Sequence, residues 1–124
     1  MSQDVVADAL NMMMNAVRAR KKSIVMKHHS KLLLSVLALA KLKGYVKSYK
    51  VEEGVLHVEI GKLHGCNSIK PRFVVAVGDV ERYIPRYLPA KEIGIIIIST
   101  NQGLMTHQTA QEKNIGGSLI AYLY

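Results

Sequence analysis

The sequence has 124 residues and a mass of 13.8 kDa, and its 17 basic against 9 acidic residues give a net charge of +8. A single Cys excludes a disulfide framework and a zinc site built from several thiolates, and the longest nearly apolar stretch, residues 32–40, is about half as long as a bilayer span requires. Residues 1–19 lack the pattern of a signal peptide, so we expect a soluble intracellular protein of one domain, or of two small halves that share an interface.

An amphipathic helix is predicted near the start of the chain. Its apolar residues recur at the spacing of one helical face: Val6, Leu10, Met13 and Val17. Asp4 precedes the first of them, in the position of an N-cap. Residues 23–27 then have the β-branched content of a short strand.

A second helix and a hairpin are predicted next. Ser30 is placed to cap the helix at its N-terminus, and Gly44 to end it. Residues 46–51 and 55–60 indicate two strands, joined by a tight turn at Glu53-Gly54. The first 60 residues therefore predict the element order α-β-α-β-β.

A boundary between two domains is predicted at residues 61–68, the only stretch rich in Gly, Asn and Ser. It separates a basic N-terminal α/β domain, residues 1–62, from a β-rich C-terminal domain, residues 67–124.

The C-terminal domain is predicted to be mostly antiparallel β with one short helix. Its strand-like segments are residues 69–77, 93–99 and 118–124. The second of these contains four consecutive isoleucines, which is typical of a strand buried on both faces. Thr106 is placed to cap the short helix, which ends near Asn114, and residues 79–89, with two prolines, predict irregular structure. The predicted fold class is α+β.

The net positive charge lies entirely in the first two-fifths of the chain. Residues 1–51 contain ten basic and two acidic residues, whereas residues 52–124 contain seven of each. A pI near 9.7 favours a polyanionic partner. One part can hold such a partner by charge, while the other must bind by shape, hydrogen bonding or packing. A bias towards solubility is the alternative interpretation.

No convergent set of reactive side chains indicates catalysis. Ser99, His107 and Asp79 could form a triad only on paper, because four isoleucines precede Ser99 where a nucleophile elbow requires a Gly-x pair. No glycine-rich phosphate loop is present. The candidate metal ligands lack the paired spacing of a structural zinc site: His57, His64 and Cys66. We therefore expect no catalytic residue, metal ion, cofactor or small-molecule substrate, and Cys66 to be a small buried hydrophobe.

Two small polar segments are candidates for a nucleic-acid contact. The first directly follows the isoleucine strand and consists of Ser99, Thr100, Asn101, Gln102 and Gly103. Its hydroxyls and amides donate and accept at once, which suits base edges and sugar hydroxyls, and its glycine allows a positive φ. Gly116-Gly117 offers a second small, uncharged surface. Beside a strongly basic half, these segments favour RNA as the partner; an ordinary polar hairpin turn is the alternative.

The run from Gly94 to His107 resembles the signature of the eighth universal small-subunit ribosomal protein, in which a hydrophobic strand enters Ser-Thr-x-x-Gly-hydrophobic-Met. Asn114-Ile115-Gly116-Gly117, followed by a strand that ends in aromatics, is similar to the second motif of that family. Other matching segments fall in order along the chain: Gln3-Asp4, Ala7–Leu10, Asn15-Ala16 and Ser30–Leu32. Residues 61–73 and 86–90 resemble the archaeal and eukaryotic branch.

The resemblance implies a two-domain structural protein of the cytoplasmic small ribosomal subunit. It implies binding to the central domain of the small-subunit rRNA early in assembly, at the minor groove of an irregular stem, beside neighbouring ribosomal proteins and away from any membrane. Carried over by position, the residues at the distorted helix core are Ser99, Thr100, Asn101, Gln102, Gly103, Gly116 and Gly117. Tyr87 and Lys91 would lie beside them, and Ser30 and Lys31 would touch the RNA backbone.

Two alternative functions remain open at the level of the sequence. One is an RNA-binding translational regulator that acts off the ribosome on its own mRNA, as some family members do. The other is a small RNA-processing enzyme, whose turnover would fail when Ser99 or His107 is changed.

Overall fold

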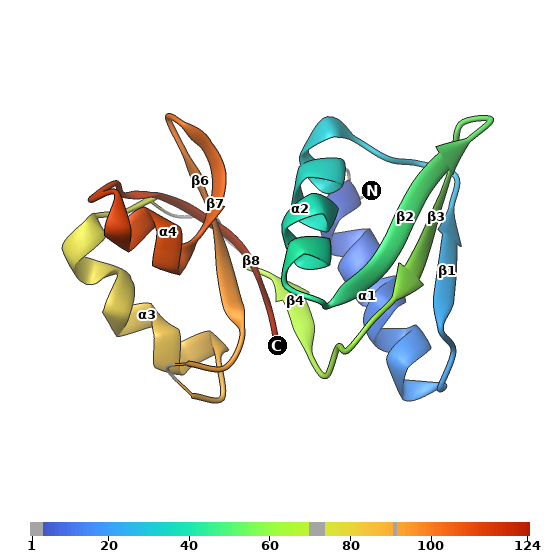
Figure 1. The fold of residues 1–124 in the computed structure, drawn as a ribbon, viewed down its shortest axis with the longest axis horizontal. Coiled ribbons are helices and arrows are strands. Elements are labelled where there is room, and N and C mark those ends of the chain that lie inside the picture. Colours follow the sequence, from blue (N-terminus) through green and yellow to red (C-terminus); the bar gives the residue numbers. More distant parts are fainter. Residues whose placement is uncertain (1–3, 70–73, 91) are drawn as a thin grey trace. The chain divides into compact units, whose positions relative to one another are not determined.

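The structure is a computed structural model that describes residues 4–69, 74–90 and 92–124. The chain divides into two compact units, residues 1–67 and 68–124 (Figure 1). Each unit has its own sheet and its own helices, and each is described by itself. No helix in the described parts of the chain is long and apolar enough to cross a bilayer.

Two capped helices open the N-terminal unit. In α1 (Val5–Arg18), the Asp4 carboxylate accepts a hydrogen bond from the amide of Ala7 at 3.0 Å. In α2 (Lys31–Leu42), the Ser30 hydroxyl accepts one from the amide of Leu33 at 3.1 Å. Both predicted N-caps are confirmed, because each side chain satisfies one of the amides that a helix start leaves without a partner.

The N-terminal sheet has the strand order β1-β3-β2 and is antiparallel throughout. Its strands are β1 (Ser23–Met26), β2 (Val46–Glu52) and β3 (Val55–Ile60). The turn between β2 and β3 has positive φ at both central residues, Glu53 (52°) and Gly54 (77°), as predicted for a tight hairpin. The two helices pack on one face of this sheet (Figure 1). The apolar side chains between them are buried: Leu10, Met13, Ile24, Leu33, Leu37, Leu56 and Val58.

The C-terminal unit is built on a second sheet, with the strand order β4-β8-β6-β7 and with β5 also paired to β8. Its strands are β4 (Cys66–Ser68), β5 (Val74–Val75), β6 (Ile95–Thr100), β7 (Gly103–Thr106) and β8 (Gly117–Leu123). The first two residues of β4 belong to the N-terminal unit. The neighbours of β6 and the β5–β8 pair are antiparallel. The four isoleucines of β6 are at most 2% exposed, as their continuous apolar run predicted.

Two helices and one 3₁₀ turn complete the C-terminal unit: η1 (Val77–Asp79), α3 (Val80–Tyr87) and α4 (His107–Glu112). The cap of α4 is Thr106, as predicted, and its hydroxyl accepts from the amide of Thr109 at 3.3 Å. Helix α3 corrects the expectation of irregular structure over residues 79–89. It forms because Val80 and Ile84 bury one side of the helix in the core of the unit, together with Leu88.

The α+β fold class and the N-terminal order α-β-α-β-β are confirmed. The strand expected over residues 69–77 is only partly described. Ile69 donates its amide to the carbonyl of Ile120 at 2.9 Å, and β5 covers Val74 and Val75. Residues 70–73, between them, lie outside the described residues.

Candidate nucleic-acid interface

The polar segment after β6 forms the tip of the β6–β7 hairpin. Thr100 pairs with Gly103 across the turn, and Asn101, Gln102 and Gly103 are exposed. The Thr100 hydroxyl accepts from the amide of Gln102 at 3.0 Å and donates to the carbonyl of Gly103 at 2.9 Å. Gly103 has a φ of 107°, which a residue with a side chain rarely adopts. One hydroxyl and one glycine therefore fix the shape of this loop.

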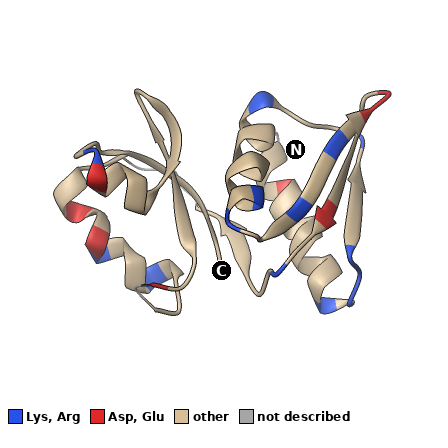
Figure 2. Cartoon of the chain, viewed as in Figure 1, with Lys and Arg blue, Asp and Glu red and all other residues tan. Residues whose placement is uncertain are grey.

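Gly117 lies against Ser99, at the base of the same hairpin, whereas Gly116 lies against the backbone of Val75 and Ala76. Strand β8 begins at Gly117, and Ser118 pairs with Ser99. A Cβ atom on Gly117 would clash with the carbonyl oxygen of Ser99 and would lie 2.9 Å from Ile98 Cγ2. The structure thus brings together the two polar segments that the sequence singled out. Neither segment contains a charged residue, and the β6–β7 hairpin is tan throughout in Figure 2.

Tyr87 lies on another part of the C-terminal unit. Its ring stacks on that of Tyr122 with centroids 5.3 Å apart, and Tyr122 stacks on Tyr124 at 6.2 Å. Tyr122 pairs with Ile96, three residues before Ser99, which is about 10 Å along a strand. Tyr87 is half-buried against the core and anchors α3 to β8. Lys91, the other residue expected beside the loop, lies outside the described residues.

Ser30 and Lys31 belong to the N-terminal unit. The Ser30 hydroxyl holds the start of α2, as described above, and Lys31 is the first residue of that helix and is exposed. No acidic residue accompanies Lys31 in the first turn. A cation at this end of a helix opposes the helix dipole, so its charge does not serve the stability of α2.

A comparison with protein families decides what kind of protein presents this surface. The family model of ribosomal protein S8 matches residues 4–124, which is nearly the whole chain. The chain belongs to the ribosomal protein S8 family. Proteins of this family are rRNA-binding components of the small ribosomal subunit and have a structural role, so the expected family is confirmed.

His107, the base of the hypothetical triad, has a structural position in this member of the S8 family. The side chain is 1% exposed, and its Nδ1 accepts a hydrogen bond from the amide of Ile96 at 3.1 Å. An imidazole held in this way has its Nδ1 lone pair occupied and is shielded from solvent. It is not placed to take a proton from the Ser99 hydroxyl.

Cys66 is buried beside α1. Its amide donates to Met14 Sδ at 3.2 Å, and its thiol donates to the carbonyl of Leu10 at 3.5 Å. Burial raises the pKa of the thiol to about 12. Among the residues that the structure describes, no three His, Cys, Asp or Glu side chains are grouped so that they could hold a metal ion.

We expect Cys66 to resist thiol reagents in the native protein. Because the thiolate is the reactive form, the raised pKa and the burial should slow labelling at pH 8 by at least about 100-fold relative to the unfolded chain. The measurement is the rate of Ellman's reagent reaction with and without denaturant. Similar rates in the two conditions would contradict the burial of this thiol.

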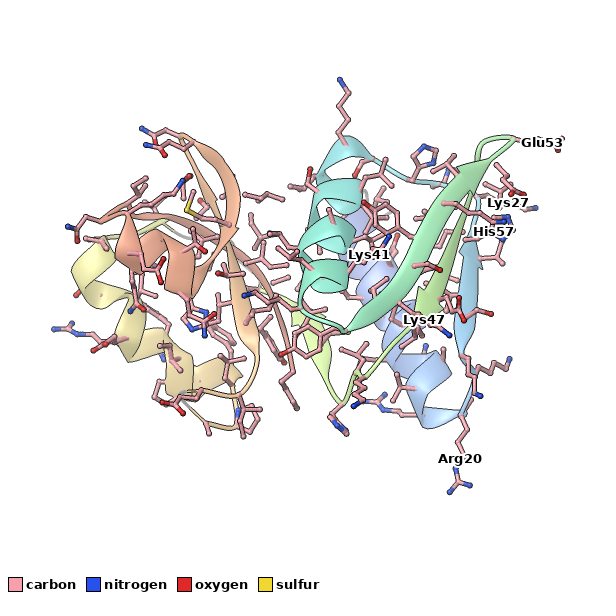
Figure 3. All side chains as sticks on the ribbon, viewed as in Figure 1. Arg20, Lys27, Lys41, Lys47, Glu53 and His57 are labelled. Atoms are coloured by element: carbon pink, nitrogen blue, oxygen red, sulfur yellow. The ribbon has the colours of Figure 1, made fainter. Side chains whose placement is uncertain are left out.

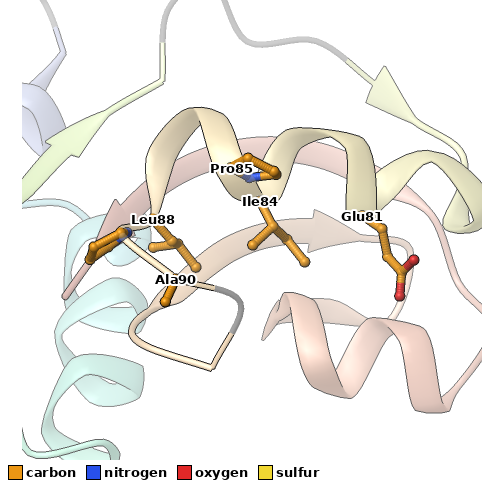
Figure 4. A pocket seen from close by; sticks show the side chains of 6 residues that line it. Glu81, Ile84, Pro85, Leu88 and Ala90 are labelled. Carbon is orange, nitrogen blue, oxygen red and sulfur yellow. The ribbon is translucent and has the colours of Figure 1, made fainter.

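One pocket lies beside α3 and contains none of the residues that were expected to contact RNA. It has a volume of about 350 Å³ and is open and largely apolar (Figure 4). Helix α3 and the residues after it form its walls: Glu81, Ile84, Pro85, Leu88, Pro89 and Ala90. The helical spacing of Ile84 and Leu88 was the available signal for this surface. Its single carboxylate and lack of convergent polar groups do not match the usual lining of a ligand site.

Proposed function

We propose that this chain is a structural constituent of the cytoplasmic small ribosomal subunit of the archaeal and eukaryotic type, which binds the central domain of the small-subunit rRNA and supports subunit assembly. Its RNA target is the minor-groove side of an irregular helix. The observation that carries this proposal is the uncharged surface made by the Ser99–Gly103 loop and Gly117. The RNA-contacting residues are Ser30, Lys31, Tyr87, Lys91, Ser99, Thr100, Asn101, Gln102, Gly103, Gly116 and Gly117.

The chemistry of the loop suits an irregular RNA helix. Asn101 and Gln102 are exposed at the tip and present amides that donate and accept. Gly103 carries no side chain, and a Cβ atom there would meet nothing within 4 Å, so an RNA sugar or base edge can approach the backbone closely at this residue. The minor groove of RNA is wide and shallow and displays 2′-hydroxyls and base edges, which such groups can bind. A regular duplex offers the same edges only in a fixed geometry, so a distorted stem is the better partner for a small, rigid loop.

Backbone contacts from the N-terminal unit complement this loop. Lys31 is an exposed cation at the start of α2, where it does not favour the helix, and a phosphate oxygen would give it a partner. Such contacts add affinity without sequence information, whereas the loop supplies selectivity.

The test is a competition gel shift at near-physiological salt. The labelled RNA is the central-domain fragment of the small-subunit rRNA, and the competitors are tRNA and a regular RNA duplex. We expect binding that survives an excess of both competitors. Equal displacement by every polyanion would refute recognition of an irregular stem. Tighter binding to the leader of the chain's own mRNA would instead favour the regulator.

The Thr100 hydroxyl offers the sharpest single-residue test of the loop. Thr100→Val keeps the shape of the side chain but removes both hydrogen bonds inside the loop, to Gln102 and to Gly103. We expect it to weaken binding to the central-domain fragment by about 1–3 kcal/mol, which is about 5-fold to 150-fold in Kd.

Thr100→Ser is the matched control, because it keeps the hydroxyl and should bind within about 2-fold of the wild type. Both variants should keep the thermal stability of the wild type within a few degrees, since Thr100 is half-exposed. If the Val and Ser variants bound the central-domain fragment with equal affinity, the loop would not be part of the binding surface.

A further inference from the structure

Exposed cations from separate segments gather at one end of the N-terminal sheet. Three successive backbone hydrogen bonds bring these segments together: Ile60 N to Lys22 O at 2.7 Å, Gly61 N to Tyr45 O at 2.9 Å, and Lys62 N to Gly44 O at 3.0 Å. They place the chain before β1, the chain before β2 and the chain after β3 side by side. We call the cations of this region the basic end: Arg20, Lys21, Lys22, Lys43 and Lys62.

The turn after α1 directs Arg20 outward from this end. Lys21 donates its amide to the carbonyl of Ala16 at 2.7 Å, and Arg20 adopts a φ of 60°. That left-handed conformation is strained for a residue with a side chain, and glycine is the usual choice there. The presence of Arg puts a cation at the tip of the turn, and Figure 3 shows its side chain pointing away from the unit.

Four of the five acidic residues of this unit lie away from the basic end. Asp4 and Asp8 are at the opposite end of α1, and Glu52 and Glu53 are at the hairpin, the opposite end of the sheet. Glu59 is close to the basic end, but its carboxylate pairs with Lys47 at 3.6 Å. All five cations of the basic end are exposed, and Figure 2 shows blue at the matching ends of α1 and α2 and in the loop after β3.

Stabilisation of the helices does not account for this cluster. Both helices end here, and cations in a last turn interact favourably with the helix dipole. Arg18 and Lys41 occupy those last turns. Of the five cations of the basic end, Lys43 is the C-cap residue of α2 and the other four lie beyond the helices. Together they repel one another unless an anion is bound. Among the residues that the structure describes, no cluster of aromatics or amides that could read bases accompanies them, which indicates contact with phosphates alone.

We propose that the basic end is a second RNA-binding surface, which holds the phosphate backbone of a regular RNA duplex. It is distinct from the Ser99–Gly103 loop and does not rest on what that loop binds. A protein with both surfaces contacts one RNA segment by shape and another by charge.

The test is a titration of a fluorescent regular RNA duplex with the full chain, followed by anisotropy over a series of KCl concentrations. The variant Lys21→Gln/Lys22→Gln/Lys62→Gln removes three positive charges from the basic end. We expect its Kd for the duplex to rise about 10-fold or more at low salt, and the slope of log K against log salt to fall by about 2–3, because each phosphate contact contributes roughly 0.7–0.9.

The matched control is Arg82→Gln/Arg86→Gln/Lys113→Gln, which removes the same net charge from exposed positions of the C-terminal unit. It should bind the duplex within about 2-fold of the wild type. Equal losses in the two variants would show that net charge alone acts, and would overturn the proposal. An unchanged salt slope in the basic-end variant would also overturn it.

A third variant separates this surface from the loop. Thr100→Val should bind the duplex like the wild type while losing affinity for the central-domain fragment. If the fragment shows no selective binding but duplex binding still depends on the basic end, the proposed function fails and this inference stands. If Thr100→Val loses duplex binding as the basic-end variant does, the two surfaces are one, and the inference fails.

Discussion

Gly117→Ala is expected to lower the free energy of unfolding by about 1–3 kcal/mol. The added methyl group meets the Ser99 carbonyl and lies 2.9 Å from Ile98 Cγ2. One neighbour is backbone and the other belongs to a fully buried side chain, so neither can move without disturbing the pairing of β6 with β8. Urea unfolding followed by circular dichroism measures the change.

The same substitution should act on RNA binding. Because Ser99 is the residue at which β6 passes into the loop, separating β8 from it changes the shape of the surface that we assign to the irregular stem. We expect the affinity for the central-domain fragment to fall about 10-fold or more, in line with the loss of one or two well-formed contacts. Binding of a regular duplex should not change, since the basic end lies in the other unit.

Gly78→Ala is the control for this experiment. Gly78 lies in η1, and a Cβ atom there would meet nothing within 4 Å. Its stability should stay within about 0.5 kcal/mol of the wild type. If Gly117→Ala behaved like Gly78→Ala in both assays, the close approach of β8 to Ser99 would have no role in stability or binding.

The N-terminal unit could be predicted in detail because its signals are local. Asp4 and Ser30 are each three residues from the amide that they cap, and Glu53-Gly54 forms its turn with its immediate neighbours. Such interactions depend on short stretches of sequence. Element order and boundaries therefore followed from reading the chain.

Helix α3 shows where local reasoning fails. Pro85 lies inside the helix and cannot donate the hydrogen bond of its position, and prolines at 85 and 89 favoured irregular structure. Val80, Ile84 and Leu88 recur at the spacing of a helical face, and their burial against the sheet outweighs the cost of the proline. The apolar face of this helix was visible in the sequence, but the strands that it packs against come later in the chain.

The candidate site was predictable in part for the same reason. The Ser99–Gly103 loop is a local turn, and its contact with Gly117 follows from the pairing of β6 with β8. Tyr87 is different, because its stacking partner Tyr122 is 35 positions away in the sequence. Only the register of β8 and the packing of α3 fix that contact, and neither is encoded near Tyr87.

His107→Phe is expected to destabilise the protein by about 1–3 kcal/mol, because it leaves one buried backbone amide without a hydrogen-bond acceptor. Ile97 pairs with Thr106, the last residue of β7, and the chain then turns into α4. The amide of Ile96 therefore has no strand partner on that side, and His107 Nδ1 accepts its hydrogen bond in a fully buried site. Phenylalanine keeps a ring of similar size but accepts nothing, so a buried donor is left without a partner.

His107→Asn separates the hydrogen bond from the packing. The Asn side-chain oxygen occupies nearly the same position as Nδ1, so the acceptor is kept while part of the ring is lost. Both variants should be less stable than the wild type, but only the Phe variant should let the Ile96 amide exchange with solvent faster than that of Ile98, measured by NMR hydrogen exchange. Equal protection of the Ile96 amide in both variants would mean that His107 acts by packing alone. Loss of an RNA-cleaving activity in either variant would instead indicate that His107 has a catalytic role.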